Sequence, residues 1–462
     1  MNSETNNNDT TMTRCQFVHQ HIKRVDGHAP SPLADKHNKM ADNPFAFYRG
    51  SAQVFYADLA AGNLRMPACL DALPLTCVVG DCHVSNFGFI TEEGSHGDTV
   101  IFAPNDFDDA CVGYAGWDIM RFLTSLALAG DYAQGIKQAH YTHSKNNSNK
   151  PVVNEAEIKQ AMAGFIRHYI ETCRRLVDNP PLINSAIKSV EPGTRLAKHY
   201  DKACRRAAGG SEFTTKSALA KAIYMSDEGL RFIRKTEKFT PLARHRYKEI
   251  EEAFAPYMDD EVIDIVQRND AGTGSLNVAR YYFLVGPAKP HDADSFARCH
   301  IVEVKQQREA APLYYFTDLA PVNRLNPAHL TARCQRKMQR KPDLLLDEAY
   351  WQKHHYLIRS RHHARVGIDP EDVTLGHKSV GGGFDEYAQW CAQALALAHA
   401  RGDRRSARFE HLVAEQLPGC EAQLLDTAWQ YARQVQQDYH DFVRALAAPA
   451  AKPGAAAPAC SR

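Results

Sequence analysis

The stretch from Val78 to Ala110 constrains the fold of this chain most strongly, because it places acidic and amide side chains beside two short apolar runs. The runs are Phe87–Ile90 and Val100–Ala103, and a polar segment containing glycine joins them. Two such runs with a turn between them predict a β-hairpin. Folding of the hairpin would bring together the polar groups at its outer ends, Asp81, His83, Asn86, Asp106 and Asp108. Converging carboxylate and amide oxygens suggest a metal site, and a metal suggests phosphate chemistry.

Length and composition set the class of the chain. At 462 residues it is too long for one ordinary core, so we expect two large lobes or about two to three domains. The 55 Lys and Arg residues balance 54 Asp and Glu residues, so no global basic field attracts nucleic acid or an anionic membrane. None of the 12 cysteines forms a C-x-x-C pair. Together with a polar start and no long apolar segment, this predicts a cytoplasmic protein.

Changes in pattern divide the chain into expected segments. The predicted order is a flexible N-terminal arm (1–40), the hairpin region as part of the larger lobe (41–140), a helical segment (141–258), a β-meander (259–320), a helical remainder (321–446) and a disordered tail (447–462). A polar break at the start of the 141–258 segment is expected to be a linker. Basic stretches beyond residue 330 lack regular aromatic interleaving, which favours a solvated face over nucleic-acid binding.

Three single residues each have two interpretations. Arg49 lies among aromatic residues and would either bind phosphate or pair with a buried carboxylate. Asp118 would either cap the helix that begins near it or hold the preceding loop in place. His399, on the Ala- and Leu-rich face of a helix, is expected to be structural rather than catalytic.

The 259–320 segment carries the second group of chemically informative residues. Three β-branched and aromatic runs, joined by a glycine turn and a longer loop, predict an antiparallel meander. The turn contains Gly272, Gly274 and Ser275, and the third run ends in Lys305. A phosphoryl-transfer site needs a lysine on the phosphates, a glycine turn that approaches them, metal ligands and a base near the acceptor hydroxyl.

The hairpin supplies the remaining parts of such a site. In G-D-C-H-V-S-N, Asp81 and Asn86 have the Asp-to-Asn spacing of a kinase catalytic loop, and Asp106 follows a strand, where the kinase magnesium aspartate would stand. These motifs resemble the aminoglycoside phosphotransferase and choline kinase branch of the protein-kinase-like fold. With F-Y-R-G, G-W-D-I-M-R, G-T-G-S and A-x-A-H-A-R, they also resemble an uncharacterised bacterial family, domain of unknown function 2252. The resemblance covers residues from about 43 to about 403.

The resemblance implies an α+β, two-lobed kinase-like fold with a small antiparallel sheet lobe and a larger, mostly helical lobe. It implies an ATP- and Mg²⁺-dependent phosphotransferase. Asp81 would be the catalytic base, and His83 would stand where many kinases carry a phosphate-contacting lysine. The implied metal ligands are Asn86, Asp106 and Asp108, and the implied nucleotide-binding residues are Gly272, Gly274, Ser275 and Lys305.

The order of these motifs is reversed relative to ordinary kinases, because the catalytic loop here precedes the glycine turn. A circular permutation would produce this order, and permutation is physically plausible where the original termini lie close together. Asn277 stands where a third glycine is expected. The acidic partner of Lys305 is left open between Glu303, on the same strand face, and Glu309.

Two other functions remain open at this point. One is a nucleotide-binding pseudoenzyme or scaffold that lacks turnover, and the other is a metal-dependent phosphoesterase that activates water. The acceptor is an unidentified small molecule or protein, and the sequence gives no oligomeric state.

Overall fold

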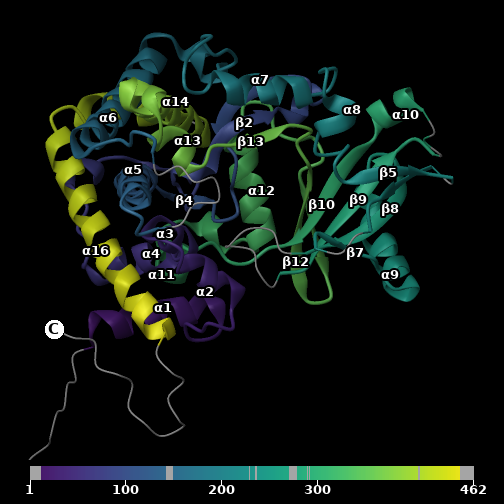
Figure 1. The fold of residues 1–462 in the computed structure, drawn as a ribbon, viewed down its shortest axis with the longest axis horizontal. Helices are drawn as coiled ribbons and strands as arrows, with labels where there is room; N and C mark the ends of the chain where they lie inside the picture. The colour runs from purple at the N-terminus through teal and green to yellow at the C-terminus, as the bar shows by residue number, and fades with distance from the viewer. Residues whose placement is uncertain are drawn as a thin grey trace, which may run out of the picture.

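The computed structural model describes residues 12–141, 149–227, 229–234, 237–269, 278–288, 290, 292–403 and 406–447. The architecture is α+β. A helical part lies on one side, and an antiparallel sheet lies on the other (Figure 1). No described helix is both long and apolar enough to cross a membrane.

The hairpin predicted from the sequence is present. Strands β2 (Phe87–Thr91) and β3 (Val100–Pro104) pair antiparallel, with Phe87 opposite Pro104. A third strand, β13 (Arg365–Gly367), adds to β2. A separate pair, β1 (Leu75–Val78) and β4 (Cys111–Tyr114), brackets the hairpin in the sequence. The two loops that carry the acidic residues therefore leave from the same end of the hairpin.

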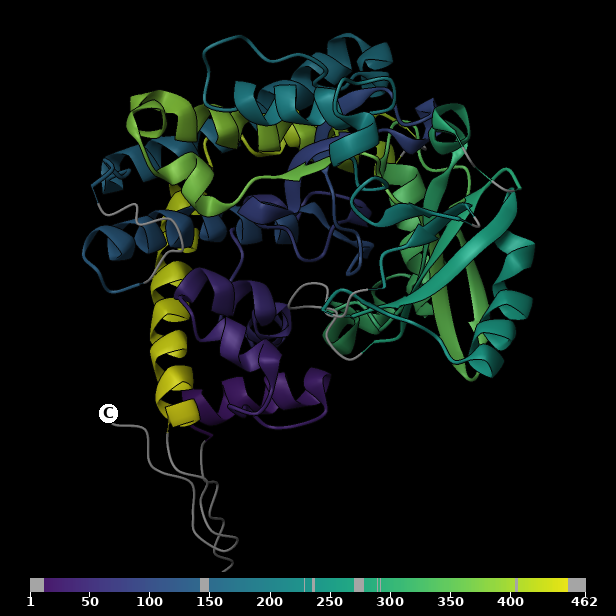
Figure 2. The same ribbon diagram turned by 45° about the vertical axis from the view of Figure 1, so that its right-hand side comes forward.

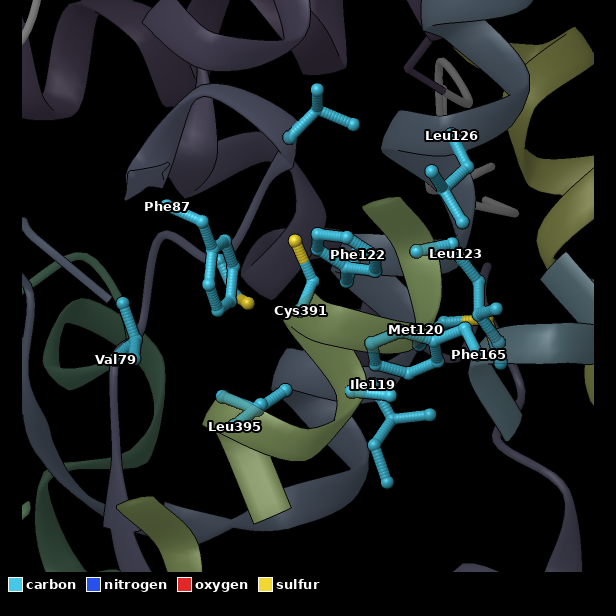
Figure 3. Packing of buried hydrophobic residues seen from close by; sticks show 14 of the residues in the cluster. Val79, Phe87, Ile119, Met120, Phe122, Leu123, Leu126, Phe165, Cys391 and Leu395 are labelled. Atoms are coloured by element: carbon cyan, nitrogen blue, oxygen red, sulfur yellow. The ribbon is translucent and has the colours of Figure 1, made fainter. Parts of the chain in front are cut away.

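The main core lies between the hairpin region and the long helices. Figure 3 shows Phe87 and Val79 facing residues of α5 (Ala115–Lys137), α6 (Glu155–Asp178) and α14 (Phe384–Asp403). α5 is buried on nearly all sides, which explains its near-continuous apolar sequence. The other principal helices around this core are α3 (Pro44–Gly50), α4 (Ala52–Ala61), α15 (Arg408–Gln416) and α16 (Glu421–Ala447).

Within the described part of the chain the sheet has six strands, in the order β11-β12-β10-β9-β8-β7. Their bounds are β7 Phe239–Thr240, β8 Glu261–Arg268, β9 Arg280–Gly286, β10 His300–Gln306, β11 Asp347–Trp351 and β12 His354–Ser360. The predicted meander is confirmed as β8-β9-β10, with both pairings antiparallel. In the turned view of Figure 2 the sheet is visibly curled.

The two faces of the sheet differ because side chains alternate along each strand. One face carries Phe283, Val304 and Ile358, which pack against α9 (Arg244–Phe254). The opposite face is apolar at one end, where the hairpin of β5 (Ile223–Ser226) and β6 (Gly229–Phe232) covers it. Its other end carries charged residues and faces the helical part. This charged end supplies half of the candidate site.

Three of the expected segments differ from the structure. The 141–258 segment contains β5, β6 and β7, and the 321–446 segment contains β11, β12 and β13 besides helix α12 (Pro327–Met338), so neither is purely helical. In 321–446, Tyr356–Ile358 are buried in the sheet, which overrides the surrounding charges. Residues 142–148 of the expected linker and residues 448–462 of the expected tail lie outside the described residues.

The expected flexible arm is the third difference. From Thr13 onward it is packed: helix α1 (Arg14–Asp26) has a capping box at its N-terminus and buries Val18 and Ile22. Arg14 forms ion pairs with Asp58 of α4 and Asp438 of α16. Two buried carboxylates on distant segments therefore attach the arm to the core, which the polar composition of the arm does not reveal.

Candidate functional site

The loop that follows β1 is held by one buried carboxylate. Asp118, in the first turn of α5, accepts the backbone N–H of Val79 at 2.6 Å and of Gly80 at 3.0 Å. His399 Nε2 of α14 lies 3.0 Å from the same carboxylate, and the Tyr169 hydroxyl lies 2.6 Å from His399 Nδ1. The loop-holding interpretation of Asp118 is therefore the one observed, and His399 is structural, as expected.

Gly80 makes this loop possible. Its φ is +81°, a left-handed conformation that residues with a Cβ rarely adopt. A Cβ at this position would also lie 1.9 Å from the carbonyl oxygen of Asp109. The glycine therefore lets the loop after β1 pass against the loop after β3, and the two acidic segments meet there.

Asp81 follows directly and is oriented by two basic groups. The buried Arg121 of α5 donates from Nη2 to Asp81 Oδ1 at 2.5 Å, and His83 Nε2 lies 3.6 Å from Oδ2. Burial opposes ionisation of Asp81, but His83 and Arg121 outweigh it and hold the pKa of this carboxyl below its ordinary value. Burial lowers the pKa of His83, and its Nδ1 accepts the Ser85 N–H at 3.2 Å. The Asp81 carboxylate opposes this effect of burial on His83.

Asn86 and Asp106 end the two loops. Asn86 Nδ2 donates to the Asp81 carbonyl at 2.8 Å, which leaves Asn86 Oδ1 as an available acceptor. The Asn105 N–H donates to the Asn86 carbonyl at 3.0 Å, so the hairpin register places the next residue, Asp106, beside Asn86. Burial and the neighbouring Asp108 carboxylate raise the pKa of Asp106. Because ionisation of Asp106 is unfavourable here, a bound cation would stabilise its carboxylate form.

Lys305 of β10 meets the hairpin loop at Asp108. Its ammonium forms an ion pair with Asp108 Oδ2, and the following Gln307 donates to the Asp108 carbonyl at 2.7 Å. Burial lowers the pKa of Lys305, partly offset by Asp108. The acidic partner left open between Glu303 and Glu309 is thus Asp108 in this structure. Lys305 therefore lies beside the hairpin loop although the two are far apart in the chain.

Glu303 has a different role, because it is surrounded by arginines. It lies opposite Arg359 in the register of β10 and β12 and is 2.9 Å from it. Arg280 and Arg361 lie 3.4 and 3.7 Å from the same carboxylate. Glu303 is fully buried, and these guanidinium groups overcome the effect of burial and hold its pKa well below the ordinary value. Glu303 therefore organises the arginines of the charged sheet face.

A polar cavity of about 270 Å³ lies between the loops and this sheet face. Its volume is close to the lower limit of small-ligand sites, roughly 300 Å³. Among the described residues, His83 and Asn86 line it together with four aspartates, Asp81, Asp106, Asp108 and Asp109, and seven arginines, Arg49, Arg268, Arg280, Arg308, Arg359, Arg361 and Arg365. Lys305 lies behind Asp108 and is only 3% exposed. Because arginines outnumber aspartates on the wall, the cavity suits an anionic ligand.

The oxygen atoms of Asn86, Asp106 and Asp108 are the candidate ligands for a magnesium ion. Asp108 Oδ1 is buried without a hydrogen-bond partner, and Asn86 Oδ1 and the Asp106 carboxylate retain free lone pairs. Hard oxygen donors of this kind fit Mg²⁺, which binds through one or two carboxylates and takes the remaining oxygens from phosphates and water. In the described part of the chain, no group of three or more His, Cys, Asp or Glu residues is arranged to hold a metal ion by itself. The set therefore fits a metal ion that arrives with phosphate oxygens.

The remaining predicted residues divide into two groups. Gly272, Gly274 and Ser275 lie outside the described residues. Arg49, which the sequence left undecided, lines the cavity.

Sequence reasoning missed Arg121 and the arginines of the sheet face. For Arg121 the signal was a lone arginine within an apolar helix. For Arg359 and Arg361 it was a two-residue spacing directly after the apolar run Tyr356–Ile358.

Comparison with known proteins gives a family. No curated protein and no solved structure matches the chain. The sequence pattern of one family matches residues 28–146 and 147–445, which include every described residue that lines the cavity. Because these ranges span most of the chain, it belongs to the family described as uncharacterized protein conserved in bacteria (DUF2252).

Proposed function

We propose that this chain is an ATP- and Mg²⁺-dependent phosphotransferase with a two-lobed, circularly permuted kinase-like fold, acting on a hydroxyl acceptor. One observation carries the proposal: Asp81, Asn86 and Asp106 line one arginine-rich cavity, and Lys305 forms an ion pair with Asp108 of its wall. A carboxylate base, oxygen ligands and a cation-rich wall are the parts that phosphoryl transfer requires.

Each group then has a role in transfer. The acceptor oxygen forms the new bond to the terminal phosphorus, its proton passes to the Asp81 carboxylate, and the bond from phosphorus to the bridging oxygen breaks to release ADP. His83 and Arg121 orient Asp81 for this step. The low pKa of Asp81 is compatible with this role, because a loose transition state depends more on positioning than on early proton removal.

Cationic side chains would contact the phosphates of the nucleotide. Lys305, Arg280 and Arg359 share one face of neighbouring strands, so they present positive charge together. Asn86, Asp106 and Asp108 would hold Mg²⁺, which neutralises phosphate charge when bound. Phosphate oxygens entering the cavity would compete with Asp108 for Lys305, and this exchange would move the lysine from its aspartate partner to the nucleotide.

A second candidate is a nucleotide-binding protein without transfer, and the observation that favours it is the ion pair between Arg121 and Asp81. A base whose Oδ1 is fixed by a buried arginine has only Oδ2 for an acceptor proton. Both candidates share the nucleotide site, and they differ in turnover.

Isothermal titration with a non-hydrolysable ATP analogue tests the nucleotide site. We expect binding with Mg²⁺, at least about tenfold weaker binding without it, and loss of the Mg²⁺ effect in Asp106→Asn. The exposed Asp71→Asn is the matched control and should behave as wild type. Equal analogue affinity with and without Mg²⁺ in the wild type would contradict the proposal.

A further inference from the structure

The arginines of the cavity differ in whether they form an ion pair with a carboxylate. Four of them pair with carboxylates: Arg308 with Asp109, and Arg280, Arg359 and Arg361 with Glu303. Arg49, Arg268 and Arg365 form no ion pair with a carboxylate among the described residues. Charged groups on a cavity wall without a protein counterion favour an anionic ligand.

The three unpaired arginines occupy different sides of the cavity. Arg268 ends β8, next to Gln267, which pairs with Tyr281 of β9, on the sheet side that we assign to the nucleotide. Arg365 donates to Asn105 Oδ1 at 3.0 Å, next to Asp106. Arg49 comes from α3 of the helical part and lines the same cavity as Asp81 and His83. Arg49 is therefore the unpaired arginine on the side of the proposed base.

Neighbouring residues hold Arg49 in place but provide no hydrogen-bond acceptor for its Nε. Its guanidinium lies 5.9 Å from the Phe45 ring centroid, and Asn43 caps the short helix that carries both residues. The Nε atom is buried and has no hydrogen-bond partner. A buried N–H of a charged group normally has an acceptor, so the missing acceptor points to a ligand oxygen.

We propose, resting on the function proposed above, that Arg49 marks a second anion subsite and that the acceptor is a hydroxyl compound bearing its own phosphate or carboxylate. Arg49 binds this anionic group and thereby places the acceptor hydroxyl at Asp81. The planar guanidinium suits two-point binding of either group, and a neutral acceptor would leave Nε unsatisfied. Arg49 thus selects the acceptor by its negative charge.

The test uses inorganic phosphate and acetate as separate probes, titrated into protein saturated with the non-hydrolysable ATP analogue and Mg²⁺. We expect one further anion to bind, with about tenfold or greater loss of affinity in Arg49→Gln. The exposed Arg174→Gln on α6 is the control and should stay within about twofold of wild type. Binding of phosphate but not acetate assigns a phosphorylated acceptor, and the reverse assigns a carboxylate.

Two results would overturn the subsite: equal anion affinity in wild type and Arg49→Gln, or no binding of either probe to the loaded wild type. Arg49→Lys, which keeps the charge but not the planar fork, separates a lost contact from misfolding and should bind with intermediate affinity. If the analogue itself does not bind, the proposed function fails. Titration of nucleotide-free protein and the same variants then still decides whether Arg49 binds an anion.

Discussion

The buried carboxylate of Asp118 offers the sharpest test of how the loop after β1 is held. It accepts the N–H groups of Val79 and Gly80 and contacts His399 Nε2, all within 3.0 Å. Asp118 and His399 are both fully buried, so water does not replace a lost partner. Asp118→Asn keeps the size of the side chain but turns one acceptor oxygen into a donor that faces other donors.

The expected cost follows from these contacts. Hydrogen bonds to a charged acceptor contribute about 1.5–3 kcal/mol each, and an unsatisfied buried donor costs about 1–3 kcal/mol. Loss of at least one bond and creation of one unsatisfied donor should lower the free energy of unfolding of Asp118→Asn by about 2.5–6 kcal/mol. His399→Gln, which removes the imidazole that contacts both Asp118 and the Tyr169 hydroxyl, should cost about 1–3 kcal/mol.

Urea denaturation followed by circular dichroism measures these changes in the wild type, both single variants and the double variant. Because the two side chains touch, their effects should not add, and the coupling energy should be about 1–2 kcal/mol. The exposed Asp71→Asn should change stability by less than about 0.5 kcal/mol. A loss below about 0.5 kcal/mol in Asp118→Asn, or additive single changes, would refute the loop-holding role.

Three further predictions concern the site. Burial and the Asp108 carboxylate raise the pKa of Asp106. Affinity for Mg²⁺ in the presence of the analogue should therefore fall on acidification at a pH where ordinary aspartates are still ionised. Calorimetry at several pH values measures this, and an affinity that does not change with pH would contradict it. Gly80→Ala should lower the free energy of unfolding by at least about 2 kcal/mol, because its φ and the Asp109 carbonyl both oppose a Cβ; thermal melts at wild-type values would contradict this. Lys305→Met should cost about 3–5 kcal/mol, because the buried Asp108 loses its nearest cation and keeps only Arg359, at 3.8 Å. Adding Asp108→Asn should recover part of this loss in urea titrations; no recovery would argue against the ion pair with Lys305.

Local patterns in the sequence predicted the parts of the fold that depend on local periodicity. The β2–β3 hairpin, the β8–β10 meander and helix α5 have alternation or apolar runs that are visible within one window. Strands β11 and β12 were missed because the surrounding basic and histidine residues resemble a solvated surface. The side of β12 that each residue faces follows only from its pairing with β10, in which Glu303 lies opposite Arg359.

The candidate site was predictable only in part, for a physical reason. Asp81, Asn86 and Asp106 lie near one another in sequence, so one hairpin brings them together. The pairing of Lys305 with Asp108 joins segments 197 positions apart, and no local signal specifies it. Arg49 gives no sequence signal that separates a ligand contact from a buried ion pair, because the difference lies in which carboxylates the fold places nearby.

Turnover of ATP in the wild type and in Asp81→Asn, with a set of phosphate- and carboxylate-bearing hydroxyl compounds as acceptors, tests the central claim most directly. We expect ADP formation coupled to a phosphorylated acceptor in the wild type. We also expect a loss of turnover of about 10²-fold or more in Asp81→Asn, with affinity for the non-hydrolysable analogue retained. Equal turnover in the two proteins would contradict the role of Asp81, and analogue binding without turnover in the wild type would contradict phosphotransfer itself.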